Sequence, residues 1–198
     1  MSADLPHPIP RIILNLVAFQ IGWLACVLGG AHQQPWLGVV VVALVVAYHL
    51  KQCVAPGREL RLLLIMGVMG AVWDGMLVRF GFLDYPSGLF VAWLAPVWII
   101  AMWVGFATTL NVSLAWLKGR WGLAVVLGGL AGPLAYYAGY RLGGVYFPDL
   151  FVAMVVLAGG WSFLMPVSLW FAQRFDGTMR AAAMPSDSQS LRGSHTGV

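Results

Sequence analysis

Six long apolar stretches, separated by short polar or charged connections, make up most of the chain. They cover residues 12–29, 36–50, 61–80, 93–117, 121–140 and 149–173. An α-helix rises about 1.5 Å per residue, so stretches of this length reach, or nearly reach, across about 30 Å of hydrocarbon. The pattern therefore predicts an all-α polytopic membrane protein, a compact bundle of six transmembrane helices.

The two polar ends of the chain fall outside this bundle. We expect an N-terminal cytoplasmic segment at residues 1–10 and a transmembrane domain at 11–173. Residues 174–198 are rich in Ser, Gly and Ala and carry scattered charges, which predicts a disordered cytoplasmic tail because such a segment has little apolar surface to bury. Pro96 is expected to separate a short interfacial piece from the fourth spanning helix.

The basic residues favour one orientation in the membrane. If both termini are cytoplasmic, nine of the eleven Lys and Arg residues lie on the inner side, and only Arg79 and Arg141 lie outside. Inner loops of membrane proteins carry such an excess of positive charge. The chain is therefore predicted to cross the membrane an even number of times, with both termini inside.

Composition excludes several classes of protein. With 61% hydrophobic and 9% charged residues, the chain departs strongly from soluble domains, which are about one-quarter charged. The net charge of +4 comes from single Lys and Arg residues between apolar stretches, so no nucleic-acid partner is expected. Cys26 and Cys53 are predicted to lie on opposite sides of the membrane, which excludes a disulfide between them.

No metal site or cofactor is predicted. His32 and His49 are expected at opposite faces of the membrane and cannot share an ion. Three methionines of the third stretch, Met66, Met69 and Met76, are interpreted as adaptable packing, because thioethers alone suit only soft ions.

Asp74 is the strongest candidate for a functional residue, because it lies within the apolar run 62–78. A charge at that depth costs a few kcal/mol and normally finds a partner inside the protein. Counting the helical rise places Asp74 and Tyr136 at one depth, roughly 20 Å from the inner face. We predict this pair as candidate catalytic residues. A purely structural role, in which Tyr136 or Arg141 pins the third helix to the fifth, remains open.

Further polar and aromatic residues lie about a turn outside this level or beside it. Arg79, Arg141, Tyr137 and Tyr140 are candidate substrate-binding residues, with Trp73 placed to wall a pocket. The two arginines either extend to lipid phosphates or hold the phosphate or carboxylate of a lipid-like substrate.

Asn111 is a further candidate substrate-binding residue, since an amide inside a spanning helix must find hydrogen-bonding partners. Bonding to Asn15 between helices is the alternative. Small residues spaced four apart, such as Gly67, Ala71 and Gly75, indicate close helix packing and suggest that the first, third and fifth helices form the inner set.

Several phrases of the sequence, taken together, resemble a bacterial inner-membrane family known only as a domain of unknown function. They are WLACVLGGA (23–31), AVWDG (71–75), GFLDYP (81–86), FATTLNVSLAWL (106–117) and AGPLAYYAG (131–139), with the spacing AP-W at 95–98. The resemblance covers most of residues 11–173. It implies a multi-pass protein of the bacterial inner (plasma) membrane, and it supplies no catalytic residues.

Three functions remain open from the sequence. The first is a membrane enzyme or lipid-modifying accessory protein that binds an acyl or isoprenoid substrate near Asp74. The second is a non-catalytic assembly protein that binds another membrane protein or a second copy of itself, and the third is a small proton- or cation-coupled transporter. Membrane lipids are expected partners in each case, and whether the chain is an enzyme is left undecided.

Overall fold

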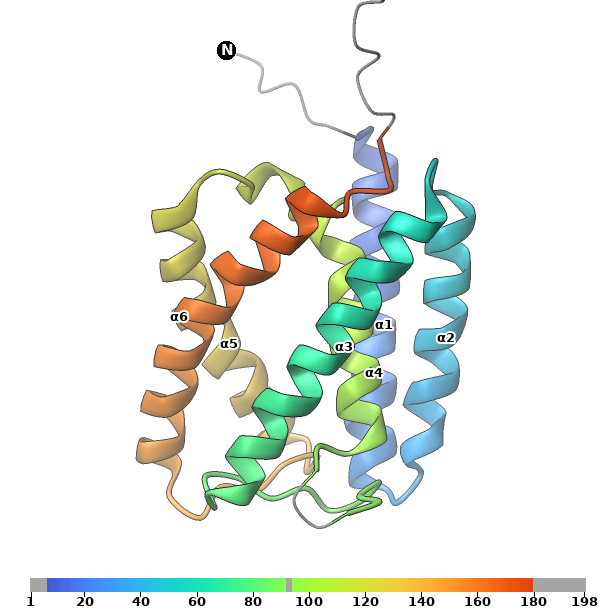
Figure 1. The fold of residues 1–198 in the computed structure, drawn as a ribbon. Helices are drawn as coiled ribbons and strands as arrows, with labels where there is room; N and C mark the ends of the chain where they lie inside the picture. Colours follow the sequence, from blue (N-terminus) through green and yellow to red (C-terminus); the bar gives the residue numbers. More distant parts are fainter. Residues whose placement is uncertain (1–6, 92–93, 180–198) are drawn as a thin grey trace, which may run out of the picture.

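Figure 1 shows the computed structural model, which describes residues 7–91 and 94–179. Six α-helices follow one another within these residues, and a short 3-10 helix separates the fourth from the fifth. Their bounds are α1 (Ile9–Ala31), α2 (Pro35–Lys51), α3 (Pro56–Arg79), α4 (Val97–Leu110), η1 (Ala115–Leu117), α5 (Trp121–Arg141) and α6 (Leu150–Arg174).

The helices have the lengths and composition of a membrane protein. Within the described residues, four helices, α1, α3, α5 and α6, are long and apolar enough to cross a membrane. The other two, α2 and α4, are shorter apolar helices. The all-helical architecture predicted from the apolar stretches is therefore confirmed, and four of its helices have the length and composition of membrane spans.

Local sequence explains where the helices begin. In α1, α2 and α3 a proline occupies one of the first two helical positions, where the missing backbone N–H is not needed for an intrahelical bond. At the start of α6, the Asp149 side chain accepts a hydrogen bond of 3.0 Å from the Val152 backbone N–H. This bond satisfies one of the free N–H groups of the first turn.

One end of the bundle gathers most of the basic residues. Arg58, at the start of α3, donates a hydrogen bond of 3.2 Å to the carbonyl of Arg174 at the end of α6. Lys118, before α5, pairs with Asp176 after α6 at 2.7 Å. These contacts bring the α2–α3 connection and the α4–α5 connection, which carry basic residues, close to the end of α6. We call this side of the bundle the basic end.

The opposite end is closed by two connections that touch each other. Asp84, after α3, and Tyr146, before α6, form an isolated antiparallel bridge, with N–H to carbonyl distances of 2.9 and 2.8 Å. Arg79 and Arg141 end α3 and α5 at this side, which we call the bridge end. Arg79 and Arg141 thus lie at the opposite end of the bundle from most of the described basic residues, as the charge pattern predicted.

The predicted fourth helix, 93–117, is shorter in the structure, because α4 ends at Leu110. The hydroxyls of Thr108 and Thr109 donate hydrogen bonds of 2.7 and 2.6 Å to the carbonyls three residues earlier. Such side-chain bonds compete with the backbone pattern of a helix. Asn111 consequently lies in a turn after the helix, not inside a spanning helix.

The central helix is α4, which differs from the predicted inner set of the first, third and fifth helices. It contacts α1, α2, α3 and α6. Helix α5 packs chiefly on α6, and this pair meets the other four helices through fewer contacts, mainly α6 with α4 and α3. Figure 1 shows the α5–α6 pair at one side of the α1–α4 group.

The chain turns back onto the basic end after α6. The backbone N–H of Gly177 donates to the Glu59 carboxylate at 2.9 Å, and its carbonyl accepts from the Ala55 N–H at 2.9 Å. Residues 175–178, which belong to the predicted tail at 174–198, make defined contacts in the structure. Residues 180–198 lie outside the described residues.

Candidate functional site

The Asp74 carboxylate is held by three side chains from different parts of the fold. Its Oδ1 accepts hydrogen bonds from the hydroxyls of Tyr85, at 2.5 Å, and Tyr136, at 2.7 Å. Its Oδ2 accepts a bond of 2.7 Å from the Trp103 indole N–H. Asp74 is 0% exposed, and no Lys or Arg of the described residues pairs with it. Three neutral donors therefore satisfy a fully buried carboxylate.

The bridge between the two loops positions Tyr85. Neighbouring residues of an extended segment point to opposite sides. Asp84, which forms the bridge with Tyr146, is exposed, whereas Tyr85 is buried and reaches Asp74. The rings of Tyr85 and Trp98 of α4 also pack in a T-shaped arrangement, with 5.3 Å between the ring centres. The contact between the loop after α3 and the loop before α6 thus fixes the position of the Tyr85 hydroxyl.

Trp103 is positioned by a glycine on one side and an aromatic ring on the other. A Cβ added at Gly70 of α3 would lie 2.1 Å from the Trp103 ring, so only glycine allows the indole to approach α3 this closely. The Trp103 ring also stacks on Trp161 of α6, with 4.9 Å between centres and 14° between planes. This stack joins the α1–α4 group to the α5–α6 pair.

A cavity of about 200 Å³ lies where these two groups of helices meet. Almost all of its wall is apolar, and α1, α4, α5 and α6 contribute to it. The lining includes Phe19, Trp23, Ile99, Phe106, Gly132 and Met165. All three hydrogen-bonding partners of Asp74 also line the cavity, whereas Asp74 does not. The carboxylate therefore lies directly behind the cavity wall.

The cavity opens at the side of α5. Ala131 and Ala135 line it, and both are exposed at the surface of that helix. They lie in the middle of an apolar helix that is long enough to cross a membrane. A dry cavity of about 150 Å³ holds a molecule of the size of benzene. The space thus fits a ring or a short stretch of an alkyl chain.

One polar atom of the cavity region has no partner. The indole Nε1 of Trp161 is buried and makes no hydrogen bond within the described part of the chain. Trp161 lines the cavity. A buried N–H group without an acceptor costs about 1–3 kcal/mol, so a molecule that offers an acceptor there would gain a hydrogen bond.

Most of the other candidate residues lie away from this cavity. Arg79, Arg141, Tyr137 and Tyr140 are exposed near the bridge end, where the Arg141 guanidinium donates to the Tyr137 hydroxyl at 3.4 Å. Trp73 packs on Gly160, where an added Cβ would lie 2.0 Å from its ring. None of them lines the cavity.

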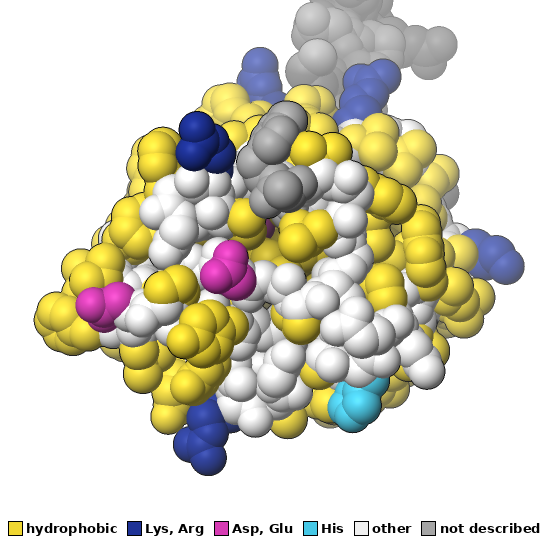
Figure 2. Space-filling view, turned by 90° about the horizontal axis from the view of Figure 1, so that it is seen from below, with side chains coloured by type: hydrophobic (Ala, Val, Ile, Leu, Met, Phe, Trp, Pro, Cys, Tyr) yellow, Lys and Arg dark blue, Asp and Glu magenta, His cyan; other side chains and the backbone are white. Residues whose placement is uncertain are grey.

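The bridge end carries few charges. Figure 2 looks onto this end, where isolated charged side chains lie among apolar side chains and backbone. A shallow hollow there is bordered by Asp84, Tyr85, Tyr140 and Tyr146, among others. Tyr85 therefore separates this outer hollow from the apolar cavity, because it lines both.

Asn111 belongs to a different cluster, at the basic end. Its amide Nδ2 donates to the Glu59 carboxylate at 2.9 Å, and the predicted bond to Asn15 is not present. Glu59 precedes Asp74 by 15 residues on α3 (74 − 59), which corresponds to roughly 22 Å along the helix. The structure thus brings Tyr136 to Asp74 and places Asn111 near the other end of the bundle.

Three residues that hold these clusters had not been singled out from the sequence. Tyr85 lies in a loop, where counting helical rise gives no depth. Trp103 is one of ten tryptophans, and Glu59 lies beside basic residues at a helix start. The Asp-Tyr-Pro order at 84–86, close after the intramembrane Asp74, is the one signal that could have pointed to Tyr85.

Comparison with known proteins gives a family without an assigned activity. The model of the family described as "Protein of unknown function (DUF2878)" matches residues 12–167. Comparisons with curated proteins and with solved structures gave no match.

Proposed function

From the premise that this chain belongs to the DUF2878 family, we propose that it binds a lipid-like molecule, with an acyl or isoprenoid chain, in the cavity in front of Asp74. The observation that carries the proposal is the apolar cavity between α1, α4, α5 and α6, with its opening at Ala131 and Ala135. Apolar pockets with a few convergent polar groups are the usual form of small-molecule sites.

The opening suits a molecule that arrives from the membrane. Its two alanines are exposed in the middle of α5, so a chain can enter sideways without crossing water. A volume of about 200 Å³ accepts only part of a long chain, and the remainder extends into the bilayer. This arrangement favours a lipid-like ligand over transport of an ion, because an almost entirely apolar wall offers few groups that could coordinate an ion.

The polar groups at the cavity favour a neutral polar end on the ligand. The hydroxyls of Tyr85 and Tyr136 donate hydrogen bonds to Asp74, so their oxygens can accept a hydrogen bond from a ligand. The Trp161 indole N–H makes no hydrogen bond of good geometry within the described residues, although it lies near the Tyr136 hydroxyl, so a ligand between the two could accept from it. An alcohol or amide can donate to a tyrosine oxygen and accept from the indole, whereas a carboxylate or phosphate adds a negative charge beside Asp74.

In this proposal Asp74 is a positioning residue. It fixes the orientation of Tyr85, Tyr136 and Trp103 and does not itself reach the ligand. Proton transfer to or from the ligand would pass through a tyrosine hydroxyl. The proposal therefore assigns binding to the cavity and leaves a chemical step to be tested by product analysis.

We also propose that all six helices cross the bacterial inner membrane, with the basic end in the cytoplasm. The excess of Lys and Arg at that end supports this orientation. In this orientation the cavity lies nearer the outer surface of the membrane, because Asp74 is closer to the bridge end of α3 than to its basic end.

Binding can be tested with an alkyl alcohol brominated along its chain, because bromine quenches tryptophan fluorescence on contact. Purified protein in detergent should show saturable quenching with this alcohol and at least tenfold weaker binding of the matching brominated fatty acid at neutral pH. Substitution Ala135→Leu, which places a larger side chain at the opening, should abolish the saturable phase. Leu134→Phe is the matched control, since Leu134 is exposed on α5 and does not line the cavity.

Two outcomes would contradict the proposal. Unchanged quenching in Ala135→Leu would show that the alcohol binds elsewhere on the protein. Equal affinity for the fatty acid and the alcohol would refute the neutral polar end while leaving apolar binding in place.

A further inference from the structure

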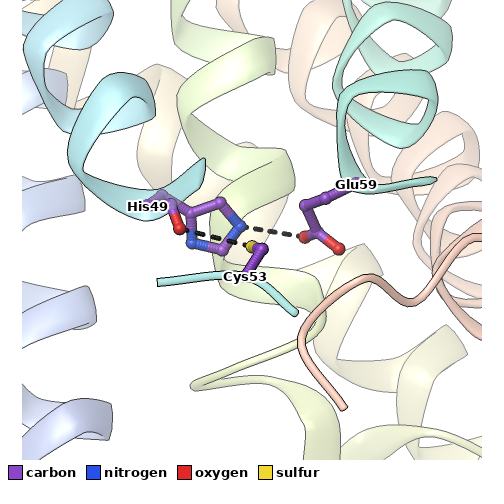
Figure 3. A group of neighbouring side chains, drawn as sticks. All are labelled: His49, Cys53 and Glu59. Atoms are coloured by element: carbon purple, nitrogen blue, oxygen red, sulfur yellow. Dashed lines mark hydrogen bonds and ion pairs between the residues drawn. The ribbon is translucent and has the colours of Figure 1, made fainter. Parts of the chain in front are cut away.

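Three potential metal ligands converge at the basic end, far from the cavity. His49 lies in the last turn of α2, Cys53 in the α2–α3 connection and Glu59 in the first turn of α3. One ligand atom from each, an imidazole nitrogen, the thiol sulfur and a carboxylate oxygen, lies within 4.8 Å of the other two. Figure 3 shows the imidazole, thiol and carboxylate facing one another.

The charge of Glu59 has little compensation at this position. Glu59 is 0% exposed, and the only ion pair it forms within the described residues is with His49, at 2.9 Å. Its other bonds come from neutral groups, the Asn111 amide and the Gly177 backbone N–H, each at 2.9 Å. A buried carboxylate normally has a full cationic partner or coordinates a metal.

An independent observation comes from Asn111. Its amide nitrogen faces the Glu59 carboxylate, which fixes the orientation of the side chain, because the amide oxygen cannot donate. Asn111 is 0% exposed, and its Oδ1 has no hydrogen-bond donor within the described part of the chain. The side chain that donates to Glu59 thus keeps a buried oxygen acceptor that is unsatisfied within the described residues.

We propose that His49, Cys53 and Glu59 bind a divalent cation of the zinc type. Nitrogen, sulfur and oxygen donors together suit Zn²⁺, whereas Mg²⁺ and Ca²⁺ prefer oxygen ligands alone. Three protein ligands leave a fourth tetrahedral position for water. Bonds of about 2.0–2.3 Å place tetrahedral ligands roughly 3.5 Å apart. The His49 and Glu59 ligand atoms, now 2.9 Å apart, would therefore separate slightly around the ion, whereas any pair near the 4.8 Å limit of the group would move closer.

Ion binding exchanges one set of contacts for another. The His49 Nε2, which faces the Glu59 carboxylate at 2.9 Å, exchanges this contact for a bond to the metal, and the ring then carries its proton on Nδ1 alone. The Cys53 thiol now donates to the His49 carbonyl at 3.2 Å and gives up its proton to solvent on coordination. The ion then ties the end of α2 to the start of α3, where Gly177 also docks.

Cobalt(II) is the probe for this site, because a thiolate bound to Co²⁺ gives a charge-transfer absorption in the near ultraviolet. The full-length protein, purified in detergent and freed of metal with a chelator, should develop this absorption with one Co²⁺ per chain and lose it when Zn²⁺ is added. Cys53→Ser should abolish the absorption. Cys26→Ser, at the other cysteine, should retain it.

His49→Gln tests the second ligand while keeping a side chain that can donate to Glu59. This variant should bind Co²⁺ at least tenfold more weakly than the wild type, with an unchanged elution profile as the check on folding. Absence of the absorption in the wild type would overturn the proposal and leave His49 and Glu59 as an ion pair. Persistence of the absorption in Cys53→Ser would also overturn it.

Discussion

Tyr85 donates a hydrogen bond of 2.5 Å to Asp74, although one residue lies in a loop and the other in the last part of a membrane-length helix. Asp74 is completely buried, and Tyr85 lines the apolar cavity. The loop at the bridge end therefore reaches into the helix bundle and supplies part of the cavity wall. Helices alone do not complete this site.

Replacing Asp74 by Asn should destabilise the protein. An amide offers one oxygen in place of two, so at least one of the donors Tyr85, Tyr136 and Trp103 would lose its acceptor. Each unsatisfied buried donor costs about 1–3 kcal/mol, which corresponds to a fall in melting temperature of roughly 2–12 °C. Thermal unfolding in detergent measures this change. Asp84→Asn is the control, because Asp84 is exposed and bridges through its backbone, and an unchanged melting temperature for Asp74→Asn would contradict the buried network.

Two adjacent glycines of α6 should respond oppositely to alanine. At Gly160 a Cβ would lie 2.0 Å from the Trp73 ring, whereas at Gly159 it would meet nothing within 4 Å. Gly160→Ala should cost about 1–3 kcal/mol because α3 and α6 must move apart. Gly159→Ala should be neutral or stabilise the helix by up to about 1 kcal/mol. Melting temperatures of both variants, measured together, test the α3–α6 contact, and equal effects would refute it.

The start of the chain should loosen at acidic pH. Burial lowers the pKa of His7, which outweighs the opposite effect of its bond to the Asn111 carbonyl at 2.9 Å. Because the folded pKa is lowered, the unfolded chain binds the proton first, and stability falls as pH drops below about 6.5. Hydrogen exchange at the start of α1, corrected for intrinsic rates, should therefore be faster at pH 5.5 than at pH 7.5. His7→Gln, which cannot titrate, should show no such change, and a pH-independent wild type would contradict the prediction.

Accessibility of introduced cysteines tests the orientation. In a background with both natural cysteines replaced by Ser, a cysteine at Arg79 or Arg141 should react with a membrane-impermeant maleimide added to intact cells. A cysteine at Lys118 should react only after the membrane is permeabilised. The reverse pattern would place the basic end outside and overturn the proposed topology.

Regular geometry explains what the sequence could predict. The apolar stretches located all six helices, and the constant helical rise placed Asp74 level with Tyr136, which the structure joins by a bond of 2.7 Å. Tyr85 could not be placed this way, because its depth depends on a bridge between two loops that are distant in sequence. Hydropathy also gave no sign that the fourth stretch breaks at Asn111, since side-chain hydroxyls and a turn cause the break.

Charge and packing patterns were informative only in part. Most of the basic residues lie at one end, as predicted, because each connection between helices lies at one end of the bundle together with all the charges it carries. The central position of α4 was missed, since the bulky rings of Trp98 and Trp103 fill the core while small residues of neighbouring helices make room for them. The convergence of His49, Cys53 and Glu59 was not predicted, because it depends on how the α2–α3 connection folds.

The stacked rings of Trp103 and Trp161 give the molecule an optical signal of its own. Two indoles 4.9 Å apart and 14° from parallel couple their electronic transitions, so their far- and near-ultraviolet circular dichroism differs from that of isolated tryptophans. One ring belongs to α4 and the other to α6, so any separation of the α5–α6 pair from the remaining helices would weaken this excitonic coupling. Spectroscopy without an added label can thus follow the opening of the seam between the two groups of helices.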